Sequence, residues 1–229
     1  MFKGLVTDVF FDLDHTLWDF EKNSGLTFKK ILADFNVEGN LDDFLAAYVP
    51  INQAYWKLYR EEKVTKQELR FGRLRKAFDE IGARVDDLTI DRLSDAYIEH
   101  LSSFNHVFPH TLEILDYLAP NYKLHIITNG FQEIQDKKLR NSNIYDYFDH
   151  IINSEQAGVK KPHPKIFELA LEKAECKAKK ALMIGDNLEA DILGARAMGF
   201  HTLHFNAHGE LPHKICPIIA SLHEIKSFL

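Results

Sequence analysis

Short apolar runs alternate with helical patterns at both ends of the chain. The first run ends at Phe11, and four more follow Pro109, each rich in the β-branched and aromatic residues that favour buried strands. They span 5–11, 124–128, 150–153, 181–184 and 202–205. Between the later runs, apolar residues recur every three or four positions, as on one face of a helix. Strands that alternate with helices predict right-handed crossovers and a mostly parallel sheet.

The middle of the chain has helical spacing and almost no strand-like alternation. Phe28, Ile31 and Phe35 lie three or four positions apart, and Thr65 with Glu68 forms a capping box before another helical pattern. The sequence therefore predicts that a helical segment interrupts the alternating part of the chain.

The predicted architecture is an α/β fold with a doubly wound, mostly parallel Rossmann-like sheet and an inserted α-helical domain. The sheet domain comprises residues 1–17 and 105–229, and the insertion comprises residues 18–104. Ligands of such sheets bind at the carboxyl ends of the strands. Because the insertion leaves the first strand at this edge, we expect it to stand over the ligand site.

Composition narrows the class of protein. Hydrophobic residues make up 45% of the 229 residues, which excludes a disordered chain. A formal net charge of -6 offers no basic field for a nucleic acid polymer. The sequence has two isolated cysteines, no secretory signal pattern and no apolar run long enough to span a membrane. These features predict a cytoplasmic protein that contacts no membrane. No pattern predicts an oligomeric state.

Polar residues follow the ends of the predicted strands. Each has an ordinary explanation as a turn or cap residue, but parallel strands bring them all to one edge of the sheet. They are Asp12, Asp14, Thr128, Asn129, Lys160, Lys161, Asp186 and Asp191.

Carboxylates gathered at one place repel each other unless a cation lies among them. Oxygen donors without a histidine or cysteine cluster favour a hard ion, which predicts Mg²⁺ as the cofactor. A threonine hydroxyl, backbone N–H groups and a lysine are suitable donors to a phosphoryl group. One carboxylate would remain to attack phosphorus and form an aspartyl-phosphate.

Four segments in this order resemble the signature motifs of the haloacid dehalogenase superfamily. They are DLDHTL, IITNG, GVKKPHPKIF and IGDNLEAD. The resemblance implies that Asp12 is the nucleophile and that Asp14 is the general acid and base. It also implies three Mg²⁺ ligands: the Asp12 carboxylate, the backbone carbonyl of Asp14 and the Asp186 carboxylate.

The same resemblance assigns the remaining motif residues. Thr128 and Asn129 would bind the phosphate oxygens, and Asp191 would orient the lysine or a metal-bound water. We expect the catalytic lysine to be Lys161 rather than Lys160, because members of the superfamily usually carry it immediately before a proline.

The resemblance also indicates a substrate class. An acid at position 14 implies a phosphate ester, and the helical insertion resembles the superfamily's small cap. ITNGF, YFDHIINSEQAGVKKP and HFNAHGE are similar to 5'-nucleotidases of pyrimidine nucleoside monophosphates. We therefore expect a small phosphorylated metabolite, a nucleoside 5'-monophosphate, with His15, Trp18 and Phe20 as candidate substrate contacts.

Three alternatives stay open. The first is a phosphatase of small sugar phosphates or phosphoglycolate, and the second is a sugar-phosphate mutase with the same intermediate. The third is a phosphorylatable signalling receiver. Receivers carry an adjacent acidic pair on the first strand, whereas Asp12 and Asp14 are separated by one residue and the GD element comes last.

Overall fold

The computed structural model describes residues 1–206 and 208–229 and divides into two compact units. One unit consists of Met1–Phe20 and Asn105–Leu229, and the other of Glu21–Phe104. The helical unit therefore begins at Glu21 rather than at the predicted Trp18, because the Trp18 backbone bridges to Asp14 and Val107 and stays with the sheet. Ala207, inside the HFNAHGE segment, lies outside the described residues.

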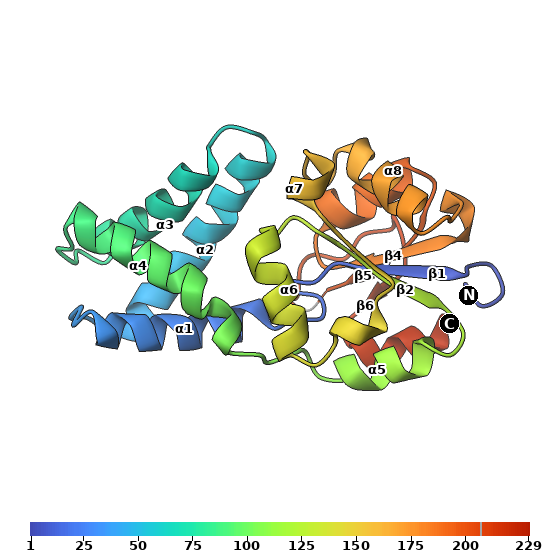
Figure 1. Ribbon diagram of the computed structural model, residues 1–229, viewed down its shortest axis with the longest axis horizontal. Coiled ribbons are helices and arrows are strands. Elements are labelled where there is room, and N and C mark those ends of the chain that lie inside the picture. Colours follow the sequence, from blue (N-terminus) through green and yellow to red (C-terminus); the bar gives the residue numbers. More distant parts are fainter. Residues whose placement is uncertain (207) are drawn as a thin grey trace. The chain divides into compact units, whose positions relative to one another are not determined.

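The first unit contains a six-stranded parallel sheet in the order β3-β2-β1-β4-β5-β6, which confirms the predicted fold class (Figure 1). The strands are β1 (Asp8–Phe11), β2 (Lys123–Thr128), β3 (His150–Asn153), β4 (Ala181–Gly185), β5 (His201–Phe205) and β6 (Ile218–Ile219). Pairing of β1 begins at Asp8 rather than at the predicted Leu5. The sequence pattern missed β6, since two residues are too short to show a periodicity.

Helices cover both faces of the sheet, with α5 on one side and α8 on the other (Figure 1). They are α5 (Thr111–Leu118), α6 (Gln132–Asn141), α7 (Ser154–Ala157), α8 (Pro164–Lys173) and α9 (Gly194–Ala197). Before α9, residues Leu188–Leu193 form a π-helical segment, η4. Phe10, Ile127 and Phe167 belong to the core packed between sheet and helices.

The strand order places β1 between β2 and β4, where the chain's winding direction reverses. In open α/β sheets this position creates a crevice at the carboxyl ends of the strands, and ligands bind there. The polar residues that follow β1, β2 and β4 therefore share the place where the fold favours a ligand.

The second unit is built from helices whose aromatic faces pack on one another. They are α1 (Phe20–Asp34), α2 (Leu41–Arg60), α3 (Lys66–Glu80) and α4 (Asp87–His100). The predicted capping box is present: the Thr65 side chain accepts from the Glu68 N–H, and Glu68 accepts from the Thr65 N–H. Among the described residues, no helix combines the length and the apolar character needed to cross a bilayer.

Candidate active site

The loop after β1 positions the first two acids. The Asp12 N–H still donates to the Ile184 carbonyl at 2.9 Å, so Asp12 lies at the last point of contact with the sheet. The chain then turns back, with the Trp18 N–H donating to the Leu13 carbonyl at 2.9 Å. This tight turn after β1 holds Asp12 and Asp14 close to the carboxyl end of the strand.

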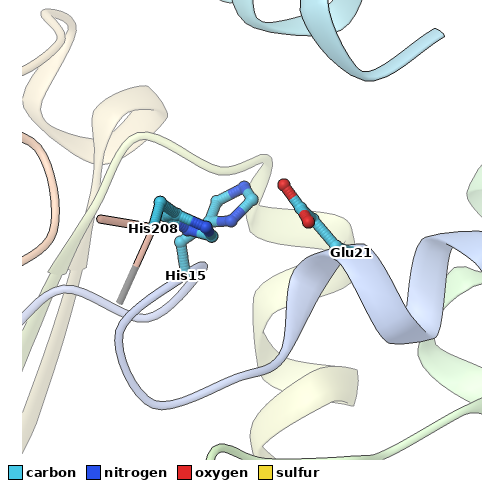
Figure 2. A group of neighbouring side chains, drawn as sticks. All are labelled: His15, Glu21 and His208. Carbon is cyan, nitrogen blue, oxygen red and sulfur yellow. The ribbon is translucent and has the colours of Figure 1, made fainter. Parts of the chain in front are cut away.

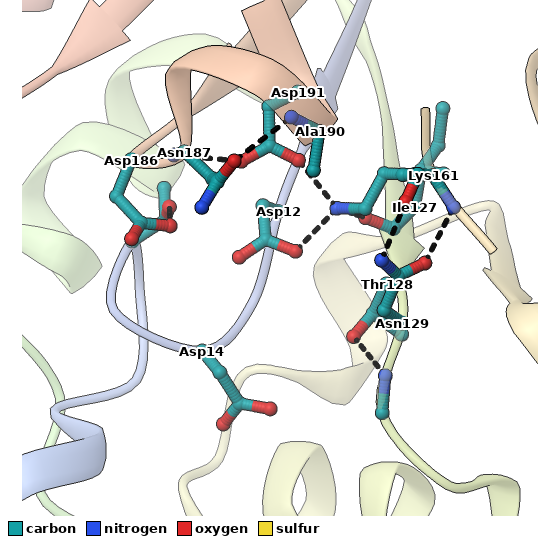
Figure 3. A network of polar contacts seen from close by, with 12 residues as sticks. Asp12, Asp14, Ile127, Thr128, Asn129, Lys161, Asp186, Asn187, Ala190 and Asp191 are labelled. Atoms are coloured by element: carbon teal, nitrogen blue, oxygen red, sulfur yellow. Dashed lines mark hydrogen bonds and ion pairs between the residues drawn. The ribbon is translucent and has the colours of Figure 1, made fainter. Parts of the chain in front are cut away.

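The end of β4 supplies two more acids. Asp191 folds back on the strand, and one of its oxygens accepts from the Asn187 N–H at 3.0 Å. A Cβ atom at Gly185 would lie only 2.4 Å from this carboxylate, so the close approach requires glycine there. Asp12, Asp186 and Asp191 each place an oxygen within 4.8 Å of the other two (Figure 3).

Lys161 lies among these acids and is only 2% exposed. Its Nζ is 2.5 Å from an Asp12 oxygen, 2.6 Å from an Asp191 oxygen and 2.6 Å from the Ile127 carbonyl. Burial alone would lower the pKa of Lys161, but the two carboxylates raise it above its ordinary value. The lysine is therefore a fixed cation. Lys160, the alternative, is partly exposed.

The electrostatic balance of the cluster calls for a further positive charge. Burial raises the pKa of Asp12 to about 7 although Lys161 opposes the shift, and the charges of Asp191 and Asp14 add to it. Burial and the two neighbouring acids also raise the pKa of Asp186 well above its usual range. Crowded carboxylate oxygens, without a histidine or cysteine in the cluster, fit a hard divalent ion such as Mg²⁺.

The end of β2 contributes a hydroxyl whose proton is available. The Thr128 oxygen accepts from the Gly130 N–H at 3.1 Å and from the Gln135 amide at 2.7 Å. The hydroxyl hydrogen can therefore point to a phosphate. The Asn129 side chain pairs with the Lys161 backbone, accepting from its N–H at 2.7 Å and donating to its carbonyl at 3.0 Å, so it fixes the lysine and keeps one N–H to spare.

The structure surrounds Asp14 with two residues that the sequence analysis missed. Lys138 contacts one Asp14 oxygen at 2.6 Å, and Gln135 donates to the other at 3.1 Å. Both come from α6 and are buried, on the same face as Ile134 and Leu139. Polar side chains on the apolar face of a predicted helix were the signal that could have revealed them.

The three candidate substrate contacts have different surroundings. The His15 ring lies beside that of His208, with centroids 5.1 Å apart (Figure 2), and 4.9 Å from that of Phe20. Burial lowers the pKa of His15 to about 4, so its ring is neutral near pH 7. Trp18 is buried, with the Lys138 ammonium 4.3 Å from its ring centroid, so its surroundings favour support of that lysine over stacking on a substrate.

Comparison with known proteins identifies the family. The model of haloacid dehalogenase-like hydrolases matches residues 9–205. Pyrimidine 5'-nucleotidase YjjG of Escherichia coli is 35% identical, over 96% of each chain. Pyrimidine 5'-nucleotidase PynA of Streptococcus pneumoniae is 33% identical, over 86% of this chain and 83% of that protein.

A solved structure agrees with the sequence relatives. The magnesium-bound HAD-hydrolase YfnB of Bacillus subtilis superposes with a TM-score of 0.87 and 29% identity, over 98% of each chain. The family model, the two relatives and this structure each match most of the chain. The chain is therefore an enzyme of the haloacid dehalogenase-like hydrolase family.

Proposed function

We propose that the protein is a Mg²⁺-dependent phosphatase that hydrolyses pyrimidine nucleoside 5'-monophosphates through an aspartyl-phosphate. The observation that carries the proposal is the position of Lys161 between Asp12 and Asp191, with Asp186 beside them. This arrangement holds a buried carboxylate next to a fixed cation. The names of the two nucleotidase relatives support the substrate class.

The reaction follows from the roles of two aspartates. An Asp12 oxygen attacks phosphorus while the ester P–O bond breaks, and Asp14 gives its proton to the leaving oxygen, which departs as an alcohol. Asp14 then takes a proton from water as the water oxygen attacks phosphorus. The bond between phosphorus and Asp12 breaks, which releases phosphate and restores both aspartates.

Other residues bind and orient the phosphate. Thr128 would donate its hydroxyl proton to a phosphate oxygen, and Lys161 would offset the negative charge of the transferred group, held in place by Asp191 and Asn129. The carboxylates of Asp12 and Asp186, with the Asp14 carbonyl, would hold Mg²⁺. When bound, the ion supplies a positive charge that stabilises the phosphoryl group.

We propose that the helical unit and the loop after Asp14 determine which leaving group the enzyme accepts. We propose that residues 21–104 act as a cap, a mobile unit whose closure excludes water from the site. His15 directly follows Asp14, and its ring lies beside that of Phe20; these two residues are the proposed contacts of the nucleoside, and the Trp18 ring lies beside that of Phe20.

A hydrolysis screen with Mg²⁺ tests this proposal. Release of phosphate should be at least about tenfold faster, as kcat/KM, for pyrimidine nucleoside 5'-monophosphates than for sugar phosphates or phosphoglycolate, the difference that about 1.4 kcal/mol of leaving-group contacts supplies. The opposite preference would overturn the nucleotide assignment. Isomerised hexose phosphate without free phosphate would show a mutase. A phosphorylated Asp12 that persists for minutes without sustained phosphate release would show a receiver.

A further inference from the structure

Two buried polar side chains on α6, Gln135 and Lys138, take no direct part in the steps of the proposed reaction. Gln135 is 1% exposed and Lys138 is 3% exposed, and they lie one helical turn apart. A buried ammonium is costly unless a specific partner compensates for the lost water. The contacts of Lys138 therefore indicate what the chain gains by burying it.

Both side chains donate hydrogen bonds to the carboxylate of Asp14. The Lys138 ammonium donates to Asp14 Oδ1 at 2.6 Å, and the Gln135 amide donates to Asp14 Oδ2 at 3.1 Å. Two donors on two oxygens fix both the direction and the rotation of the Asp14 carboxylate. An ionised carboxylate has about four acceptor sites, so it can still exchange a proton with a substrate oxygen or a water.

The Lys138 ammonium also contacts two aromatic rings. Its Nζ lies 4.3 Å from the Trp18 ring centroid and 5.3 Å from that of Phe20, within the range of a cation–π interaction. Trp18 is buried, so it cannot move away without opening the core. The ammonium is therefore held between the rings and the Asp14 carboxylate.

Gln135 connects this carboxylate to the phosphate site. The same amide nitrogen that contacts Asp14 also donates to the Thr128 oxygen at 2.7 Å. A Cβ atom at position 130 would lie 2.3 Å from this nitrogen, so Gly130 makes room for the contact. One face of α6 thus sets the distance between the proposed acid and the proposed phosphate donor.

We propose that Lys138, together with Gln135, is a positioning residue that holds Asp14 for proton transfer. The inference rests on the proposed phosphatase function. Misplacing Asp14 should slow the release of a poor leaving group, which needs a proton, much more than that of a good one, which departs as an anion. A residue with a purely structural role would slow both equally.

The test compares two esters in the Lys138→Met variant, which keeps the apolar part of the side chain against the rings. With a pyrimidine nucleoside 5'-monophosphate, kcat/KM should fall by about 10²-fold, the lower range of general acid catalysis. With p-nitrophenyl phosphate it should fall by less than about threefold, because nitrophenolate needs no proton. Lys138→Arg, which preserves the charge, should restore most of the loss.

The neighbouring Lys137 is exposed on α6 and provides the matched control, since Lys137→Met should leave both rates unchanged. Gln135→Met is the second test and should show the same dependence on the leaving group, so the comparison survives if Lys138→Met does not fold. Equal losses on both esters, or none, in a folded variant would overturn the inference. Absence of hydrolysis by the wild-type enzyme would instead overturn the proposed function, and the inference with it.

Discussion

β1 carries one buried aspartate, Asp8, at its start and another, Asp12, just beyond its end. Their surroundings shift the pKa values of the two carboxyl groups in opposite directions. Asp8 accepts from the Thr7 hydroxyl at 2.6 Å and from His125 Nε2 at 3.0 Å. Although burial raises the pKa of Asp8, these hydrogen bonds lower it below its usual value. For Asp12, burial and the neighbouring acids raise the pKa to about 7.

The comparison shows that burial alone does not mark a functional acid. Asp8 is 4% exposed and Asp12 is 7% exposed, so both have lost most of their contact with water. Asp8 receives donors in return and stabilises the native state. Asp12 receives one lysine, which it shares with Asp191, and faces a third acid. When the fold supplies too little positive charge and too few hydrogen-bond donors for a buried carboxylate, that carboxylate is a candidate ligand of a bound cation.

The largest difference between the two aspartates should appear in turnover. Asp12→Asn removes the proposed nucleophile and should lower kcat by about 10⁴-fold or more, as loss of a nucleophile does in other enzymes. Asp8→Asn should keep kcat within about threefold, since Asp8 lies at the opposite end of the strand. Steady-state phosphate release per folded molecule measures both. Substantial turnover by Asp12→Asn would refute the nucleophile.

The second largest difference should appear when Mg²⁺ is removed, because the proposed metal site lies only at the carboxyl end of β1. Chelation should abolish hydrolysis, and added Mg²⁺ should restore it. Because a ligand of the native state stabilises by mass action, Mg²⁺ at 100 times its dissociation constant should raise the free energy of unfolding by about 2.7 kcal/mol. The same addition should stabilise Asp8→Asn equally and Asp186→Asn little. Hydrolysis that survives exhaustive chelation would contradict the metal site.

The motif residues could be predicted from the sequence because the fold fixes where they meet. Strand ends of a parallel sheet share one edge, so acids after β1 and β4 and the threonine that ends β2 had to converge. Asp8 could likewise be expected to be a structural acid, since it falls inside the first apolar run.

The contacts of Asp14 could not be predicted, because they depend on how α6 is rotated against the sheet. The positions of Lys138 and Gln135 on the apolar face of the predicted helix indicate that they are buried, but only tertiary packing determines that they contact Asp14. The same holds for η4, whose π-helical turns bring Asp191 back onto Gly185, a geometry that a regular 3.6-residue period does not reveal.

Stability should show the reverse ranking of the two aspartates. Asp8→Asn removes the charge that accepts from Thr7 and His125 in a buried site, and should lower the free energy of unfolding by about 1–3 kcal/mol. Asp12→Asn, measured with chelator at pH 7, should raise it, because it removes one of three crowded acids. Urea denaturation provides both values. Asp12→Asn that is less stable than the wild type under these conditions would contradict the repulsion inferred here.

The two positions should also differ in the pH dependence of their contributions to stability. The pKa of Asp12 is about 7 in the native state and 3.8 when unperturbed, so between these values the native state binds more protons than the unfolded state. Its contribution to stability therefore decreases as pH rises from about 4 to 7, by at most about 1.4 kcal/mol per pH unit. Asp8 behaves oppositely: its lowered pKa gives a contribution that is present above 3.8 and lost as pH falls through the native value.

Urea denaturation in chelator from pH 4.5 to 7 separates these two contributions. The stability of Asp12→Asn relative to the wild type should increase steadily across this range, whereas that of Asp8→Asn should stay constant, because Asp8 has already ionised in both states. A constant difference for Asp12→Asn would mean that Lys161 alone compensates the nucleophile in the native state. The acids around it would then exert no net repulsion, and the contrast between the two ends of β1 would reduce to their hydrogen bonds.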